Sequence, residues 1–177
     1  MKAAIYCITW VIFLVLSQQS LAEERNKSHG LDNDHQTSLV LNGRGTRKAM
    51  FFDLYTCELY LREPTDDAAR ILGEKGPITV QLEVHGDPPG SILGAWAAVL
   101  KRELSDKMFR KTTMLYRDLE EGDRIQLHYV PENGTTVAIN GESLFVDPGR
   151  DLIHAVLDQW VGEAPVSDEL KEALLGK

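Results

Sequence analysis

Apolar and polar residues alternate in separate stretches of the first half of the chain, a pattern that predicts β-strands. In residues 78–84 apolar side chains alternate with Thr, Gln and Glu, as in a strand that buries one face. Residues 39–41 predict a short strand, and residues 47–62, which contain neither Gly nor Pro, predict one long strand. The glycines of Asn42-Gly43-Arg44-Gly45 predict a turn between these two strands.

A second group of strands is predicted towards the end of the chain. Residues 125–129 alternate in the same way, and the dipeptides Asn133-Gly134 and Asn140-Gly141 separate them from the apolar residues of 137–139 and 143–146. An Asn-Gly pair between alternating segments is the strongest local signal for a β-hairpin. We therefore expect a three-stranded antiparallel meander.

Apolar residues recur at helical spacing in the remaining segments, where we expect helices. These segments cover residues 64–73, 92–104, 105–119, 147–160 and 168–175. Pro64-Thr65-Asp66-Asp67 places acids at the start of the first of these helices. Ser105-Asp106 and Ser167 can cap two others, and Gly176 is suited to end the last. Strands and helices in this order predict an α+β fold with a largely antiparallel sheet.

The N-terminal residues differ in composition from the rest. Lys2 precedes an apolar run from Ala3 to Leu16, and the polar residues after it end at Ala22 in the pattern of a secretory signal peptide. The run has about fourteen residues, whereas a membrane span needs roughly twenty, so cleavage is favoured over a retained anchor. The sequence thus predicts a signal peptide (1–22), a polar flexible leader (23–38) and one domain (39–177). We expect an exported, periplasmic protein with no membrane span after cleavage.

Composition and motifs exclude several kinds of function. The formal net charge of −8 argues against nucleic acids and anionic membranes, which attract basic patches. Once Cys7 leaves with the signal peptide, Cys57 is predicted to be a small buried apolar residue rather than a nucleophile. The chain has no nucleophile elbow, zinc-protease or phosphate-loop motif. His85, His128 and His154 have no carboxylate or cysteine at ligand spacing, so we expect no metal site and no cofactor.

Two parts of the chain together resemble the chalcone isomerase-like family. The first is Gly43-Arg44-Gly45-Thr46-Arg47, followed by a segment that ends in Tyr60-Leu61. The second runs from Glu121-Gly122-Asp123 to the closing segment with Gly162-Glu163 and Ser167-Asp168-Glu169-Leu170-Lys171. The resemblance extends from about Leu39 to Gly176 and is weakest over 86–119. It implies a bent, open sheet packed against helices, with an apolar cleft between them.

The resemblance also implies a set of ligand-binding residues. Plant isomerases of the family bind a ketone with an arginine that Arg47 matches and a threonine on the next strand. In a fatty-acid-binding branch a tyrosine replaces that threonine and holds a carboxylate together with the arginine. Tyr55 falls at this position, a shift of one residue would place Thr56 there, and Tyr60 belongs to the same motif. The implied ligand-binding residues are therefore Arg47, Tyr55, Thr56 and Tyr60.

The resemblance leads us to expect one function and leaves two alternatives open. The leading expectation is a non-catalytic or weakly catalytic protein that binds a small apolar carboxylate or lipid-like ligand, such as a fatty acid. The alternatives are an isomerase, or intramolecular lyase, acting on an enone, and a structural or partner-binding envelope protein. Gln159 stands where the plant enzymes have a threonine, which argues against chalcone cyclisation. On one continuous strand Arg47 and Tyr55 would lie about 26 Å apart, so a sharp bend must intervene for both to reach one ligand.

Overall fold

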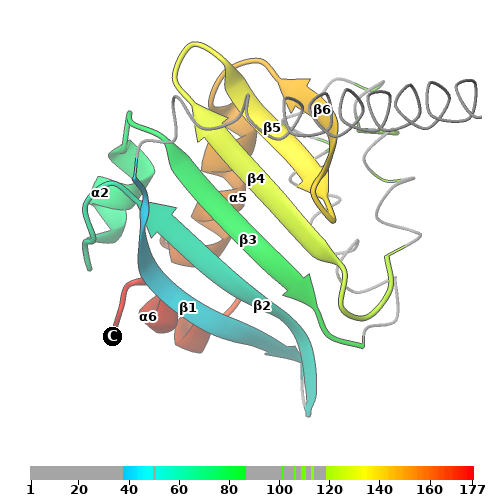
Figure 1. The fold of residues 1–177 in the computed structure, drawn as a ribbon. Helices are drawn as coiled ribbons and strands as arrows, with labels where there is room; N and C mark the ends of the chain where they lie inside the picture. Colours follow the sequence, from blue (N-terminus) through cyan, green and yellow to red (C-terminus); the bar gives the residue numbers. More distant parts are fainter. Residues whose placement is uncertain are drawn as a thin grey trace, which may run out of the picture. The chain divides into compact units, whose positions relative to one another are not determined.

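Six antiparallel strands form one sheet, and they lie side by side in the order in which the chain makes them (Figure 1). The strands are β1 (Val40–Ala49), β2 (Phe52–Leu61), β3 (Ile78–Val84), β4 (Arg124–Val130), β5 (Gly134–Ile139) and β6 (Glu142–Asp147). The helices with defined bounds are α2 (Ala68–Gly73), α5 (Asp151–Val161) and α6 (Asp168–Leu174). The predicted α+β fold with an antiparallel sheet is confirmed.

These elements come from a computed structural model that describes residues 38–49, 51–86, 101, 106, 109–110, 113 and 119–177. They belong to one compact unit, Ser38–Lys177. The predicted signal peptide, most of the leader and most of the two middle helices lie outside the described residues. Within the predicted middle helices, Lys101, Asp106, Phe109, Arg110 and Thr113 are described and are helical. No helix among the described residues is long and apolar enough to cross a membrane.

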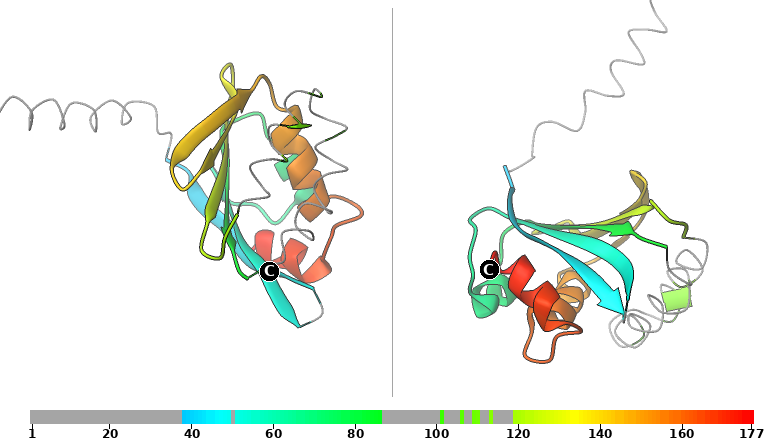
Figure 2. Two further views of the ribbon diagram at one scale, coloured as in Figure 1. Left: turned by 90° about the vertical axis from the view of Figure 1, so that its right-hand side faces the viewer. Right: turned by 90° about the horizontal axis from the view of Figure 1, so that it is seen from below.

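The core lies between the sheet and helices α5 and α6, which cover one of its faces (Figure 2). The apolar stripe of α5 is fully buried, and Trp160 is among its largest buried side chains. Alternate residues of each strand point to the same face. Cys57 and Leu59 of β2 and Val80 of β3 are therefore buried on the helix-facing side, each with 0% exposure. Burial also raises the pKa of the Cys57 thiol, as does the neighbouring Glu58 charge, which fits the prediction of an inert buried cysteine.

Most of the local predictions are confirmed. β3 and the β4–β5–β6 meander occupy the predicted segments. Asn140 and Gly141 join β5 to β6 with positive φ values of 52° and 83°, as a tight hairpin turn requires. Asp67 caps α2 and Ser167 caps α6 through their side-chain oxygens. Helix α5 begins later than predicted, at Asp151, because Asp147 completes β6.

The prediction for the first two strands was wrong in both of its parts. Residues 42–45 lie within β1 rather than in a turn, and the predicted long strand 47–62 is instead a hairpin of β1 and β2. Asn42 is the extra residue of a β-bulge, since Leu41 pairs with Tyr60 and Gly43 with Leu59. Asn and Gly are typical of bulges as well as turns, so composition alone could not separate the two.

Asn42 and the two glycines have a packing role that explains why they stand in a strand. The Asn42 side chain donates to the carbonyls of Thr65 and Leu174 and accepts the Thr65 N–H, at 3.1, 2.7 and 2.6 Å. A Cβ atom on Gly43 would lie 2.3 Å from the carbonyl oxygen of Ala173. A Cβ atom on Gly45 would lie 2.8 Å from the Cβ atom of Ala173. Glycine therefore lets the last turns of α6 pack directly on the backbone of β1.

Candidate functional site

Arg47 and Tyr55 lie directly opposite each other on β1 and β2. Directly opposed residues of an antiparallel pair share a face, with Cβ atoms about 4.5–5.5 Å apart. The hairpin thus supplies the sharp bend that the sequence argument required, and it removes the 26 Å separation expected on a continuous strand. Sequence reasoning missed this turn because residues 47–62 contain no glycine or proline.

A second bulge follows immediately next to this pair. Lys48 pairs with Asp53, so Leu54 of β2 is the extra residue. The bulge places Leu54, Tyr55, Thr56 and Cys57 in a run of four buried residues. The N–H of His85 donates to the Leu54 carbonyl at 2.9 Å, which ties the bulge to the end of β3. Bulges commonly redirect side chains beside functional sites.

Tyr55 is held in place by a tryptophan of α5. Its side chain is only 4% exposed, and its Oη accepts a hydrogen bond of 3.1 Å from Trp160 Nε1. The two rings have centroids 6.3 Å apart and planes tilted by 48°. The indole N–H can only donate, so the phenol oxygen must be the acceptor. Arg47 is half-buried, and its guanidinium donates to the Lys48 carbonyl.

The structure separates the four predicted ligand-binding residues into two pairs. Arg47 and Tyr55 lie on the helix-facing side. Thr56 and Tyr60 are an odd number of residues after Tyr55 on β2, so they lie on the other face. Thr56 Oγ1 is hydrogen-bonded to His85 Nε2 at 2.7 Å and to Thr46 Oγ1 at 3.1 Å. The ligand-binding role of all four residues stays a prediction. Alternation along the predicted strand already separates Tyr55 from Thr56 and Tyr60, but the sequence could not show that the turn and the bulge bring Arg47 directly opposite Tyr55.

Tyr60 belongs to a polar network on that other face. Its hydroxyl donates to Glu58 Oε2 at 2.7 Å, while Arg44 Nε lies 3.3 Å from Glu58 Oε1. The hydrogen bond to Glu58 is the main cause that raises the pKa of Tyr60. Tyr60 is therefore committed as a donor to a neighbouring carboxylate.

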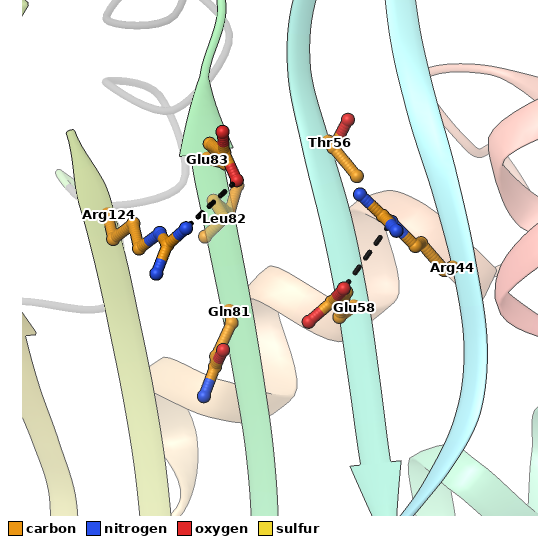
Figure 3. A pocket seen from close by; sticks show the side chains of 7 residues that line it. All are labelled: Arg44, Thr56, Glu58, Gln81, Leu82, Glu83 and Arg124. Carbon is orange, nitrogen blue, oxygen red and sulfur yellow. Dashed lines mark ion pairs between the residues drawn. The ribbon is translucent and has the colours of Figure 1, made fainter. Parts of the chain in front are cut away.

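A shallow cavity of about 220 Å³ lies on the same polar face (Figure 3). It is lined by Arg44, Thr56, Glu58, Gln81, Leu82, Glu83 and Arg124. Arg44 pairs with Glu58, and Arg124 Nη2 lies 3.7 Å from Glu83 Oε2 (Figure 3). Both arginines are already paired with carboxylates within the cavity, and its walls are mostly polar. Such a lining does not suit an apolar ligand.

Two of the described histidines are hydrogen-bonded to threonines. His128 Nδ1 lies 2.7 Å from Thr79 Oγ1, and burial lowers the pKa of His128. His85 is bonded to Thr56, and His154 is exposed on α5. Within the part of the chain that the structure describes, no group of His, Cys, Asp or Glu could hold a metal ion.

Comparison with known proteins identifies the family of this fold. The family model described as chalcone isomerase-like matches residues 31–176. The chain belongs to the chalcone isomerase-like family. The resemblance seen in the sequence from about Leu39 to Gly176 is thus confirmed, and the match begins a few residues earlier.

A solved structure supports the fold of this chalcone isomerase-like protein. A fatty-acid binding protein from Arabidopsis thaliana matches with a TM-score of 0.56 and 20% sequence identity. The match covers 78% of this chain and 87% of that one. No curated protein matches the chain. At this identity the likeness shows the fold alone.

Proposed function

We propose that this protein binds a small apolar carboxylate, such as a fatty acid, between its sheet and its helices. Arg47 and Tyr55 would hold the carboxylate. The observation that carries the proposal is their direct pairing on the helix-facing side of the β1–β2 hairpin. The fatty-acid binding of the Arabidopsis structural neighbour supports the same ligand class. Export through the predicted signal peptide is part of the proposal, and a mature N-terminus at Glu23, read by mass spectrometry, would test it.

The chemistry of the two side chains fits a carboxylate at one end of an apolar molecule. A guanidinium binds a carboxylate through two parallel hydrogen bonds. Trp160 fixes the position of the neighbouring phenol, so little side-chain entropy is lost when a ligand binds. The buried apolar residues of the helix-facing side continue from this point and would contact the hydrocarbon part of the ligand. The polar cavity around Arg44 provides no such wall.

Native mass spectrometry of the purified full chain, together with displacement of a fluorescent polyene fatty acid, tests the proposal. Hydrogen bonds to charged groups contribute about 1.5–3 kcal/mol, and about 1.4 kcal/mol corresponds to tenfold in affinity. We therefore expect Arg47→Ala to weaken binding at least about tenfold. Tyr55→Phe keeps the ring against Trp160 and should weaken binding by a smaller factor.

Arg44→Ala is the matched control, because Arg44 lies on the same strand but on the opposite face. It should bind the fatty acid as well as the unchanged protein does. The proposal fails if no acyl species is bound, or if Arg47→Ala and Arg44→Ala bind equally well.

A further inference from the structure

The β1–β2 hairpin extends past the end of the neighbouring strand. The pairing of β2 with β3 stops at Tyr55 and Val84, so Phe52 and Asp53 have no partner in β3. The end of the hairpin therefore projects from the sheet, as Figures 1 and 2 show. We define the hairpin tip as the described residues Lys48, Ala49, Phe51, Phe52 and Asp53.

Two adjacent phenylalanines form the outermost part of this tip. Phe51 is 95% exposed and Phe52 is 65% exposed. Single exposed apolar residues are common on protein surfaces, but neighbouring large apolar residues mark contact sites. A folded protein that leaves both rings in water forgoes the free energy of burying them. Something outside the described residues should therefore contact the tip.

Charged residues lie directly behind the phenylalanines. Lys48 and Asp53 face each other across the hairpin, and their side chains pair at 3.5 Å with exposures of 65% and 53%. Ala49 pairs with Phe52 one step nearer the turn, so Lys48 and Asp53 stand only about 3.3 Å along the strands behind that pair. Segments that bind at a membrane interface bury apolar side chains about 5–10 Å into the headgroup and acyl boundary. The charged pair would limit insertion to the turn and the Ala49–Phe52 pair, at the shallow end of that range.

The shape of the tip favours a bilayer over a protein groove. Phe51 lies in the turn and Phe52 at the first position of β2, so the apolar surface is at the end of the hairpin rather than along one of its faces. A protein groove would contact a face or an edge of the strands. A fluid interface can instead surround a projecting end. With a formal net charge of −8, the protein should prefer neutral over anionic lipids.

The same hairpin carries the proposed carboxylate site. Arg47 is two residues from Ala49 at the end of β1, about 7 Å along the strand at roughly 3.3 Å per residue. A tip inserted at the interface would hold Arg47 close to the level where fatty-acid carboxylates lie in a bilayer. This link to the ligand rests on the proposed function, whereas contact of the tip with lipid does not.

From these observations we propose that the hairpin tip docks the protein on the surface of a neutral lipid bilayer by inserting Phe51 and Phe52. The docked protein would exchange its apolar carboxylate ligand with the bilayer. No covalent step is involved.

Phe51→Trp tests the docking directly when the full chain is mixed with phosphatidylcholine vesicles that carry brominated acyl chains. Residues 3–16 are apolar and can bind vesicles by themselves, so the readout must be local to the tip. Once the emission of Trp10, Trp96 and Trp160 in the unchanged chain is subtracted as background, the introduced indole should emit at shorter wavelength and be quenched at least about twofold.

Leu41→Trp is the matched control, because Leu41 is 48% exposed at the opposite end of β1. It should add no quenching. Equal quenching at both positions, or none at position 51, would overturn the proposal. Dimerisation of the unchanged protein that Phe51→Ser/Phe52→Ser abolishes would also overturn it, because the phenylalanines would then contact a second copy.

Transfer of a fluorescent fatty acid from vesicles separates docking from ligand binding. Phe51→Ser/Phe52→Ser should slow the transfer at least about tenfold and leave equilibrium binding of the dissolved fatty acid unchanged. Arg47→Ala, combined with Phe51→Trp, should lose the fatty acid but keep the quenching. Loss of fatty-acid binding with quenching retained would refute the proposed function alone, and unchanged transfer by the double serine variant would refute the exchange role of the tip.

Discussion

The two faces of the sheet differ in what holds their side chains in place. On the helix-facing side, apolar residues with almost no exposure pack against α5 and α6, and Gly43 lets α6 contact the backbone of β1. On the other face, side chains join neighbouring strands through hydrogen bonds and exposed ion pairs such as Arg44–Glu58. Packing on the helix-facing side contributes most of the protein's stability, whereas the polar face contributes through many weak hydrogen bonds and ion pairs. Substitutions should therefore cost far more on the first face.

Trp160→Ala should have the largest effect. Removing a fully buried aromatic side chain costs about 3–5 kcal/mol in the free energy of unfolding. Trp160 is 1% exposed and also donates to Tyr55, so we expect the loss to reach this range, measured by urea unfolding. Gln81→Ala on the polar face should cost less than about 0.5 kcal/mol. Similar losses for both variants would show that the two faces do not differ as described.

Gly43→Ala tests the close packing of α6 on β1. Its new methyl group would lie 2.3 and 2.4 Å from the carbonyl oxygens of Ala173 and Leu174, so α6 must shift. Overpacking of this kind costs about 1–3 kcal/mol. Gly73→Ala is the control, because a Cβ there meets nothing within 4 Å and alanine should stabilise by about 0.4–1 kcal/mol. Urea unfolding of both variants measures the difference, and a Gly43→Ala protein of unchanged stability would contradict the role assigned to the glycine.

The smallest expected effect concerns pH and the polar face. Burial lowers the pKa of His128 from its ordinary value of 6.5, so its contribution to stability is complete above that pH. As the pH falls from 6.5 through the folded pKa, the unfolded chain binds the proton first and this contribution is lost. His128→Asn can still bond Thr79 but does not titrate.

The free energies of unfolding of His128→Asn and the unchanged protein should therefore converge, or change order, as the pH falls below 6.5. Taking their difference at each pH removes shared contributions, such as that of Asp147, whose pKa is raised by burial and by the charge of Asp151. A difference that does not vary with pH would show that His128 is not the titrating group.

Local chemistry in the sequence determined much of the fold. The alternation of 78–84, the two Asn-Gly dipeptides and the caps Asp67 and Ser167 each specify an element through nearby residues, and all of them appear in the structure. The family also followed from two sets of motifs, each made of residues that are close together in the chain. Cys57 was predicted to be buried because a lone cysteine within an apolar strand behaves as a small apolar side chain.

Only the tertiary structure decided what Asn42-Gly43-Arg44-Gly45 does and where the strand after it turns. The two glycines allow α6 to pack against β1, and Asn42 bonds to Leu174, which is 132 residues further along the chain. No local sequence pattern indicates a contact over such a separation. The turn near Phe51 and the bulge at Leu54 then set which side chains share a face. A one-residue change in register moves every following side chain to the other face. The sequence could therefore name Arg47, Tyr55, Thr56 and Tyr60, but only the paired strands brought Arg47 directly opposite Tyr55.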